Sequence, residues 1–98
     1  MRTEFKFEGK PVVFDLKPGT LYRLAKAGYS FPESFGKSDT ALLVTTELLR
    51  ICSKTDLTSE EVADRIDDYE PLMQAMADLF ESEEAKLKAK DEDEPGNG

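Results

Sequence analysis

The first fourteen residues most constrain the fold, because they follow the alternating pattern of a two-stranded hairpin. Phe5 and Phe7 alternate with charged residues, as in a strand with one apolar and one solvated face. Gly9 allows a turn, and the return strand covers residues 12–14, with Pro11 at its first position. Since a lone hairpin is marginal in water, its aromatic face must pack on helices or on a partner.

Two helices are predicted next. Thr20 is the expected N-cap of a short first helix, and Gly28 is the expected residue after its C-cap. A second helix is predicted from about Asp39, as N-cap, to Ser53. Its apolar residues lie on most sides, which is typical of a central core helix.

Two further helices complete the predicted body. The segment Thr58-Ser-Glu-Glu61 is a capping box and opens a short third helix. Pro71 suits the first turn of a fourth helix. The predicted fold is α+β and mainly α: an N-terminal β-hairpin packed on a bundle of about four helices. Residues 1–88 form one domain, and residues 89–98 form an acidic tail expected to be disordered.

The charge of the chain limits its partners. The formal net charge is −8 and charged residues make up 35% of the 98. Such a field repels phosphate backbones, so no nucleic-acid partner is expected. Solubility is the simplest role for this charge, while mimicry of DNA or binding to a basic partner stay open.

The residues needed for common catalytic chemistry are missing. The chain has no histidine and only one cysteine, Cys52, so His-dependent triads and multi-cysteine metal sites are excluded. The acidic pairs at 60–61 and 67–68 lie at predicted helix ends, where carboxylates serve caps and dipoles. We expect no enzyme, no cofactor and no metal. The sequence also shows no run of about 18 apolar residues and no signal-peptide pattern, so we expect no membrane partner and an intracellular location.

Two apolar groups are candidates for partner binding. One lies in the loop after the first helix and the other on the fourth helix; together they comprise Phe31, Phe35, Met73, Met76, Leu79 and Phe80. The favoured interpretation is that they complete a small core. The alternative is a face for a partner segment, to which methionine adapts well.

The hairpin and the first helix carry a resemblance to a known family. The stretches are Phe5-Lys-Phe-Glu-Gly-Lys10, Val12-Val-Phe-Asp-Leu16 and Leu21-Tyr-Arg-Leu-Ala-Lys-Ala-Gly28. Together with a helical body and a charged tail, this layout resembles the tail assembly chaperones of long-tailed bacteriophages.

The resemblance implies a non-enzymatic chaperone in the host cell cytoplasm. It would solubilise the tape measure protein and help recruit tail tube subunits. The family commonly makes a longer form by a −1 ribosomal frameshift, and Pro95-Gly-Asn97 permits a slippery heptamer in the coding sequence. No binding residue is carried over from the family, and self-association is left open.

Two other function classes stay open. An acidic inhibitor that mimics DNA would bind a basic protein with strong salt dependence. A structural tail or head-completion subunit would use the hairpin edge to add a strand to a neighbour.

Overall fold

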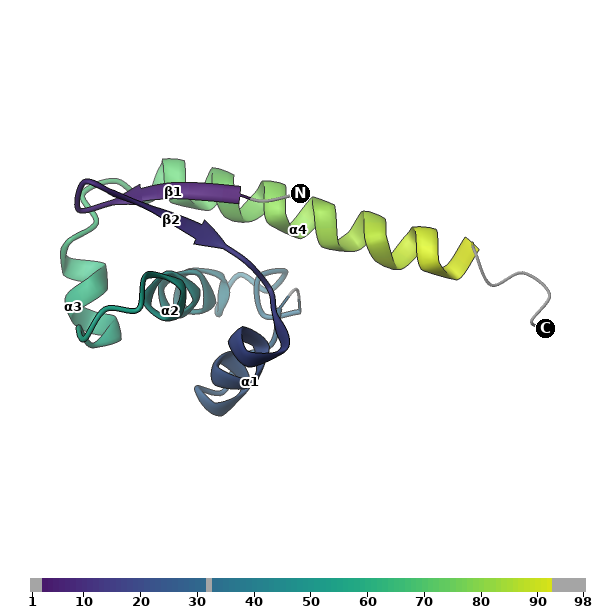
Figure 1. Cartoon of the computed structure of the whole chain (residues 1–98), viewed down its shortest axis with the longest axis horizontal. Coiled ribbons are helices and arrows are strands. Elements are labelled where there is room, and N and C mark those ends of the chain that lie inside the picture. Colours follow the sequence, from purple (N-terminus) through teal and green to yellow (C-terminus); the bar gives the residue numbers. More distant parts are fainter. Residues whose placement is uncertain (1–2, 32, 93–98) are drawn as a thin grey trace.

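The computed structural model describes residues 3–31 and 33–92, with side chains as far as residue 86. A hairpin precedes four helices, which confirms the predicted fold class (Figure 1). The elements are β1 (Thr3–Phe7), β2 (Lys10–Phe14), α1 (Pro18–Lys26), α2 (Ala41–Ser53), α3 (Ser59–Asp64) and α4 (Tyr69–Glu92).

The hairpin forms as its sequence pattern predicts. β1 and β2 pair antiparallel, with Phe7 opposite Lys10. The two turn residues, Glu8 and Gly9, have φ angles of 53° and 79°, the left-handed pair that a tight two-residue hairpin turn requires. Pro11 is the second residue of β2 rather than the first, and it pairs with Lys6.

Helix α1 begins earlier than predicted but ends as predicted. Its first residue is Pro18 and its N-cap is Lys17, so Thr20 lies inside the helix. The fixed φ of proline is suited to the first helical position, which explains the early start. At the other end Gly28 adopts a φ of 97°. The N–H of Gly28 donates to the Ala25 carbonyl at 2.9 Å and the N–H of Tyr29 donates to the Leu24 carbonyl at 3.1 Å, which is the Schellman motif.

The predicted N-cap of the second helix, Asp39, was wrong by one residue. Helix α2 begins at Ala41 with Thr40 as N-cap, and Asp39 makes no cap. The hydroxyl of Thr40 instead donates to the Ser34 carbonyl at 2.5 Å, and the Lys37 carbonyl accepts from the Ala41 N–H at 2.9 Å. A turn therefore leads the chain into α2 without a side-chain cap.

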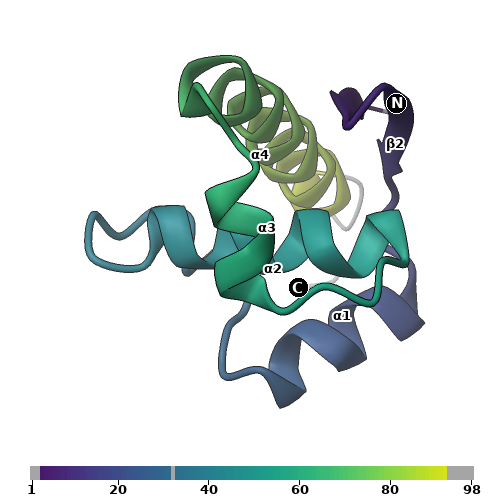
Figure 2. The ribbon, with the colours of Figure 1, turned by 90° about the vertical axis from the view of Figure 1, so that its left-hand side faces the viewer.

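Helix α2 is the centre of the fold, as predicted. The hairpin, α1, α3 and α4 surround it (Figure 2). The core residues are Phe7, Val12, Phe14, Leu24, Phe31, Val44, Leu48, Leu49, Val62, Leu72, Ala75, Met76 and Leu79. The apolar character of α2 is not wholly buried, however: Leu42 and Leu43, in its first turn, are 51% and 53% exposed.

Helix α4 continues past the predicted domain boundary. Residues 89–92, assigned to the tail from the sequence, are the last residues of this helix. The last apolar residue in the core is Phe80, and the helix beyond it projects from the body (Figure 1). Residues 93–98 of the predicted tail lie outside the described part of the chain.

A candidate client-binding groove

The sequence-predicted aromatic residues form one cluster. The rings of Phe31 and Phe35 lie 5.9 Å apart between centroids, and Phe80 of α4 is 6.2 and 5.5 Å from them. These separations suit favourable tilted and edge-on aromatic contacts. The cluster joins the loop before α2 to α4, so it stabilises the body.

The predicted residues of α4 lie mostly inside the body. Met76 is fully buried and Leu79 is 3% exposed, while Met73 is half-buried. Phe31 is also buried, whereas Phe35 and Phe80 are half-buried. In this conformation Phe31, Met76 and Leu79 offer almost no surface to a partner. A partner role for the other three stays a hypothesis.

Among the described residues, the large aliphatic side chains with the highest exposed fraction lie elsewhere, in the first turn of α2. Leu42 and Leu43 stand beside a surface groove of about 260 Å³. We call it the Leu42/Leu43 groove; its lining residues are Ala27, Tyr29, Leu42, Leu43, Thr46, Glu47, Ser59, Glu60, Ala63 and Tyr69. The end of α1, the start of α2, α3 and the start of α4 therefore meet there.

Hydrogen bonds between elements fix the walls of this groove. The hydroxyl groups of Thr46 and Tyr69 lie 2.6 Å apart, which ties α2 to α4. The hydroxyl of Ser59 donates to Glu47 at 2.5 Å, which ties α3 to α2. Because α3 and α4 are both bonded to α2 here, these walls of the groove are formed before any partner arrives.

The charged residues that line the groove are both acidic. Glu47 is buried and accepts from the Nε of Arg50 at 2.7 Å, so its charge is compensated. Glu60 is exposed and makes no ion pair with any residue in the described part of the chain. The groove thus combines apolar walls with one carboxylate at its rim.

Sequence periodicity did not single out these leucines. The pattern of α2 shows apolar residues on most sides, and this pattern cannot indicate which turn protrudes beyond its neighbours. The available signal was a pair of adjacent leucines, Leu42 and Leu43, after a polar turn. Neighbouring residues in a helix point in different directions, so a single packed face does not cover both.

Comparisons with protein-family models, curated proteins and solved structures found no match to this chain. In the described part of the chain, no helix has both the length and the apolar content needed to cross a membrane. Within the same residues, no three potential metal ligands are grouped.

Proposed function

We propose that this chain is a non-enzymatic tail assembly chaperone that holds an apolar helical segment of the tape measure protein in the Leu42/Leu43 groove. The observation that carries this proposal is the exposure of Leu42 and Leu43 beside a groove with bonded walls. Adjacent exposed leucines at such a groove are typical of a surface that binds another protein.

The family resemblance supports the same function. The three stretches that carry it correspond to β1 and its turn, to β2, and to α1 with its C-terminal glycine. The first two build the hairpin, and the end of α1 contributes Ala27 to the groove. A helical client presents apolar residues at positions i, i+3, i+4 and i+7, which is the pattern that fits an apolar groove.

The charge at the rim of the groove predicts which residues flank the apolar stripe of the client. Glu60 would attract a lysine or arginine that flanks the apolar stripe of the client, whereas a flanking acid would be repelled. In this proposal the protein acts in the host cell cytoplasm. It keeps the tape measure protein soluble while tail tube subunits are recruited to it.

Co-expression tests this function directly. The tape measure protein from the same genome would be expressed with and without the chain, and its soluble fraction measured. The variant L42E/L43E should fail to keep the client soluble while retaining the circular dichroism spectrum and melting temperature of a folded protein. The matched control is L21E/Y22E, which adds the same charge to two exposed apolar residues of α1 that do not line the groove.

The possible results distinguish a wrong binding site from a wrong function. Solubilisation by the wild-type chain and by both variants would overturn the groove while keeping the chaperone. No solubilisation by the wild-type chain would overturn the chaperone. Binding to a basic, DNA-handling protein that competes with DNA would favour the inhibitor instead.

A structural tail or head-completion subunit is the second candidate. The hairpin has only two strands in the described residues, so each strand has an edge without a strand partner. Assembly through such edges uses backbone hydrogen bonds and would persist at high salt.

A further inference from the structure

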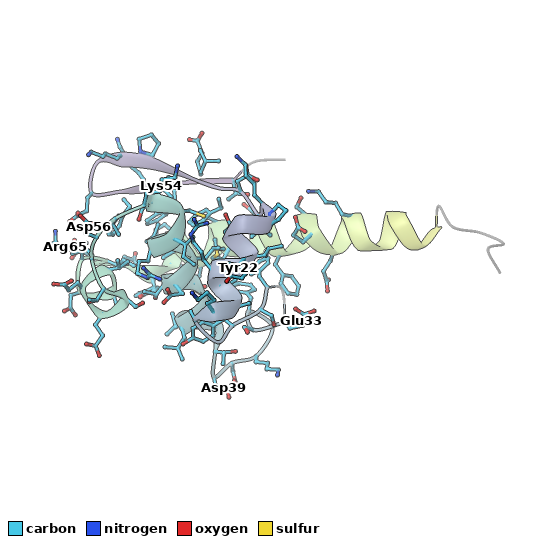
Figure 3. All side chains as sticks on the ribbon, turned by 60° about the horizontal axis from the view of Figure 1, so that its bottom comes forward. Tyr22, Glu33, Asp39, Lys54, Asp56 and Arg65 are labelled. Carbon is cyan, nitrogen blue, oxygen red and sulfur yellow. The ribbon has the colours of Figure 1, made fainter. Side chains whose placement is uncertain are left out.

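A second and larger hollow lies between the hairpin, α1 and the end of α2. Its volume is about 1330 Å³, which exceeds the few hundred to 1,000 Å³ typical of small-molecule sites. Figure 3 shows Lys54 beside the hairpin, and the hollow runs from there toward α1. A hollow of this size suits a segment of polypeptide.

The hollow is basic although the protein is acidic. Six of the thirteen lysines and arginines line it, against two of the 21 acidic residues. Six positive less two negative charges give the hollow a formal charge of +4, so the remaining residues of the chain carry −12. The basic residues are Lys10, Lys17, Arg23, Lys26, Arg50 and Lys54, and the acidic ones are Glu8 and Asp15.

Most of this positive charge is not compensated within the described residues. Lys17 pairs with Asp15 at 3.6 Å, and Arg50 pairs with Glu47. Glu8 is already paired with Arg65 at 2.8 Å, on the far side of the turn. Among the described residues, no ion pair occupies the other four basic side chains that line the hollow. Like charges gathered in this way repel each other, and an acidic occupant would relieve that repulsion.

The same chain carries a matching acidic segment. Beyond Phe80, helix α4 continues for twelve residues to Glu92, about 18 Å of helix. We call residues 81–94 the arm. Its sequence holds seven acidic and three basic residues, a formal charge of −4, and it includes the acidic run at 91–94. The arm and the hollow are therefore complementary in charge.

We propose that the arm of one copy binds in the basic hollow of a second copy, in a head-to-tail arrangement. A copy cannot readily fill its own hollow, because the part of α4 beyond Phe80 projects away from the body of the protein (Figure 1). Unlike surfaces in contact make a heterologous interface, which closes into a ring or extends into a filament. The hollow and the Leu42/Leu43 groove have different linings, with Ala27 alone common to both.

Nucleic acid is the other class that a basic hollow attracts. The net charge of −8 opposes its approach, since long-range repulsion acts on a polyanion many times longer than the hollow. A short acidic helix carries far fewer negative charges than a nucleic acid, so the net charge of the protein repels it less. The observations favour the arm, and nucleic-acid binding is an outcome of the test.

The experiment uses the full chain and two matched variants. K10E/K54E reverses one strand lysine and one loop lysine of the hollow. K6E/K37E reverses one strand lysine and one loop lysine outside it, so both variants have the same net charge. A third variant, D91N/E92Q/D93N/E94Q, neutralises the acidic run of the arm. Circular dichroism would establish that each is folded.

Sedimentation equilibrium would measure self-association in about 50 mM and about 500 mM salt. The wild-type chain should associate at low salt, and the dissociation constant should rise at least about tenfold at high salt, because exposed ion pairs are screened. K10E/K54E and the arm variant should each weaken association at least about tenfold relative to K6E/K37E.

Mixing K10E/K54E with the arm variant tests directly whether the arm of one copy binds the hollow of another. The first retains a working arm and the second a working hollow, so the mixture should form a 1:1 pair that does not grow further. A wild-type chain that stays monomeric at low salt and about 100 µM would overturn the proposal. So would association that resists high salt, or tight binding of a short oligonucleotide lost in K10E/K54E. Binding of the arm to the hollow of its own copy would also overturn the proposal. It would be seen as NMR chemical-shift changes in the hollow residues of the arm variant that do not depend on protein concentration.

Discussion

Replacing Met76 by alanine tests whether this side of α4 belongs to the core or serves as a face for a partner. The Met76 side chain is fully buried, with no exposed surface. Truncating a buried methionine to alanine costs about 2–5 kcal/mol, from lost burial and from the cavity left behind. With about 3 kcal/mol as the central value, the melting temperature should fall by about 15 °C in a domain of this size. The domain should still fold at 25 °C, since small domains have about 5–15 kcal/mol of stability.

Met73→Ala is the matched control, because it makes the same truncation in the same helix. Met73 is only half-buried, so its loss should cost about 1 kcal/mol. Urea unfolding followed by far-ultraviolet circular dichroism measures both variants, since the chain has no tryptophan. Equal costs for the two truncations, or a cost below about 1 kcal/mol for Met76→Ala, would refute the packing of α4 described above.

Three further predictions follow from single residues. Lys54 adopts a φ of 57° after α2, so Lys54→Gly should raise the free energy of unfolding by about 0.5–1 kcal/mol, measured by urea titration; a loss of stability would contradict the left-handed assignment. Burial raises the pKa of the Cys52 thiol, so iodoacetamide should modify it more slowly at pH 8 than in the urea-unfolded chain, and equal rates would show an open site. Hydrogen bonds, first of all from the Thr58 backbone, lower the pKa of Glu61 below 4.5. The stabilisation from this carboxylate is therefore present above its ordinary pKa and is lost as the pH falls through the lower folded value. Thermal melts should show wild type more stable than Glu61→Gln at pH 6, with the difference shrinking toward pH 3; a difference that does not change with pH would contradict the capping box.

Local sequence signals determined the elements and several of their ends. The Glu8-Gly9 turn, Gly28 after α1, and the capping box of Thr58 and Glu61 are all where the sequence places them. These features depend on the conformational preferences of one or two residues and on hydrogen bonds within four residues. Such interactions can be evaluated without the rest of the fold.

The sequence predicted helix starts less accurately where no such signal was present. Thr20 and Asp39 are good capping residues by type, yet α1 begins at Pro18 and α2 begins after Thr40. In the first case proline takes the first helical position, and in the second the turn at 37–41 satisfies the N–H groups. Competing local solutions of similar energy decided these ends.

The distribution of surface and core was decided by the tertiary structure. Leu42 and Leu48 are the same residue in the same helix, but Leu42 is 51% exposed and Leu48 is fully buried. Only the positions of the neighbouring elements distinguish them, because the hydrophobic effect depends on the surface that packing removes from water. For the same reason the sequence favoured a core role for the aromatic residues over a partner face without deciding it, and the structure packs Phe31, Phe35 and Phe80 against one another.

The net charge follows from the composition, whereas the location of the basic hollow follows from the tertiary structure. The sequence by itself determined an acidic protein with the elements of a hairpin and four helices, since net charge and local propensities are sums over residues. The basic hollow gathers residues from position 10 to position 54, and no local pattern links them. Only the packing of the hairpin and of α1 on α2 places these lysines and arginines around one hollow, because electrostatic fields depend on distances in space.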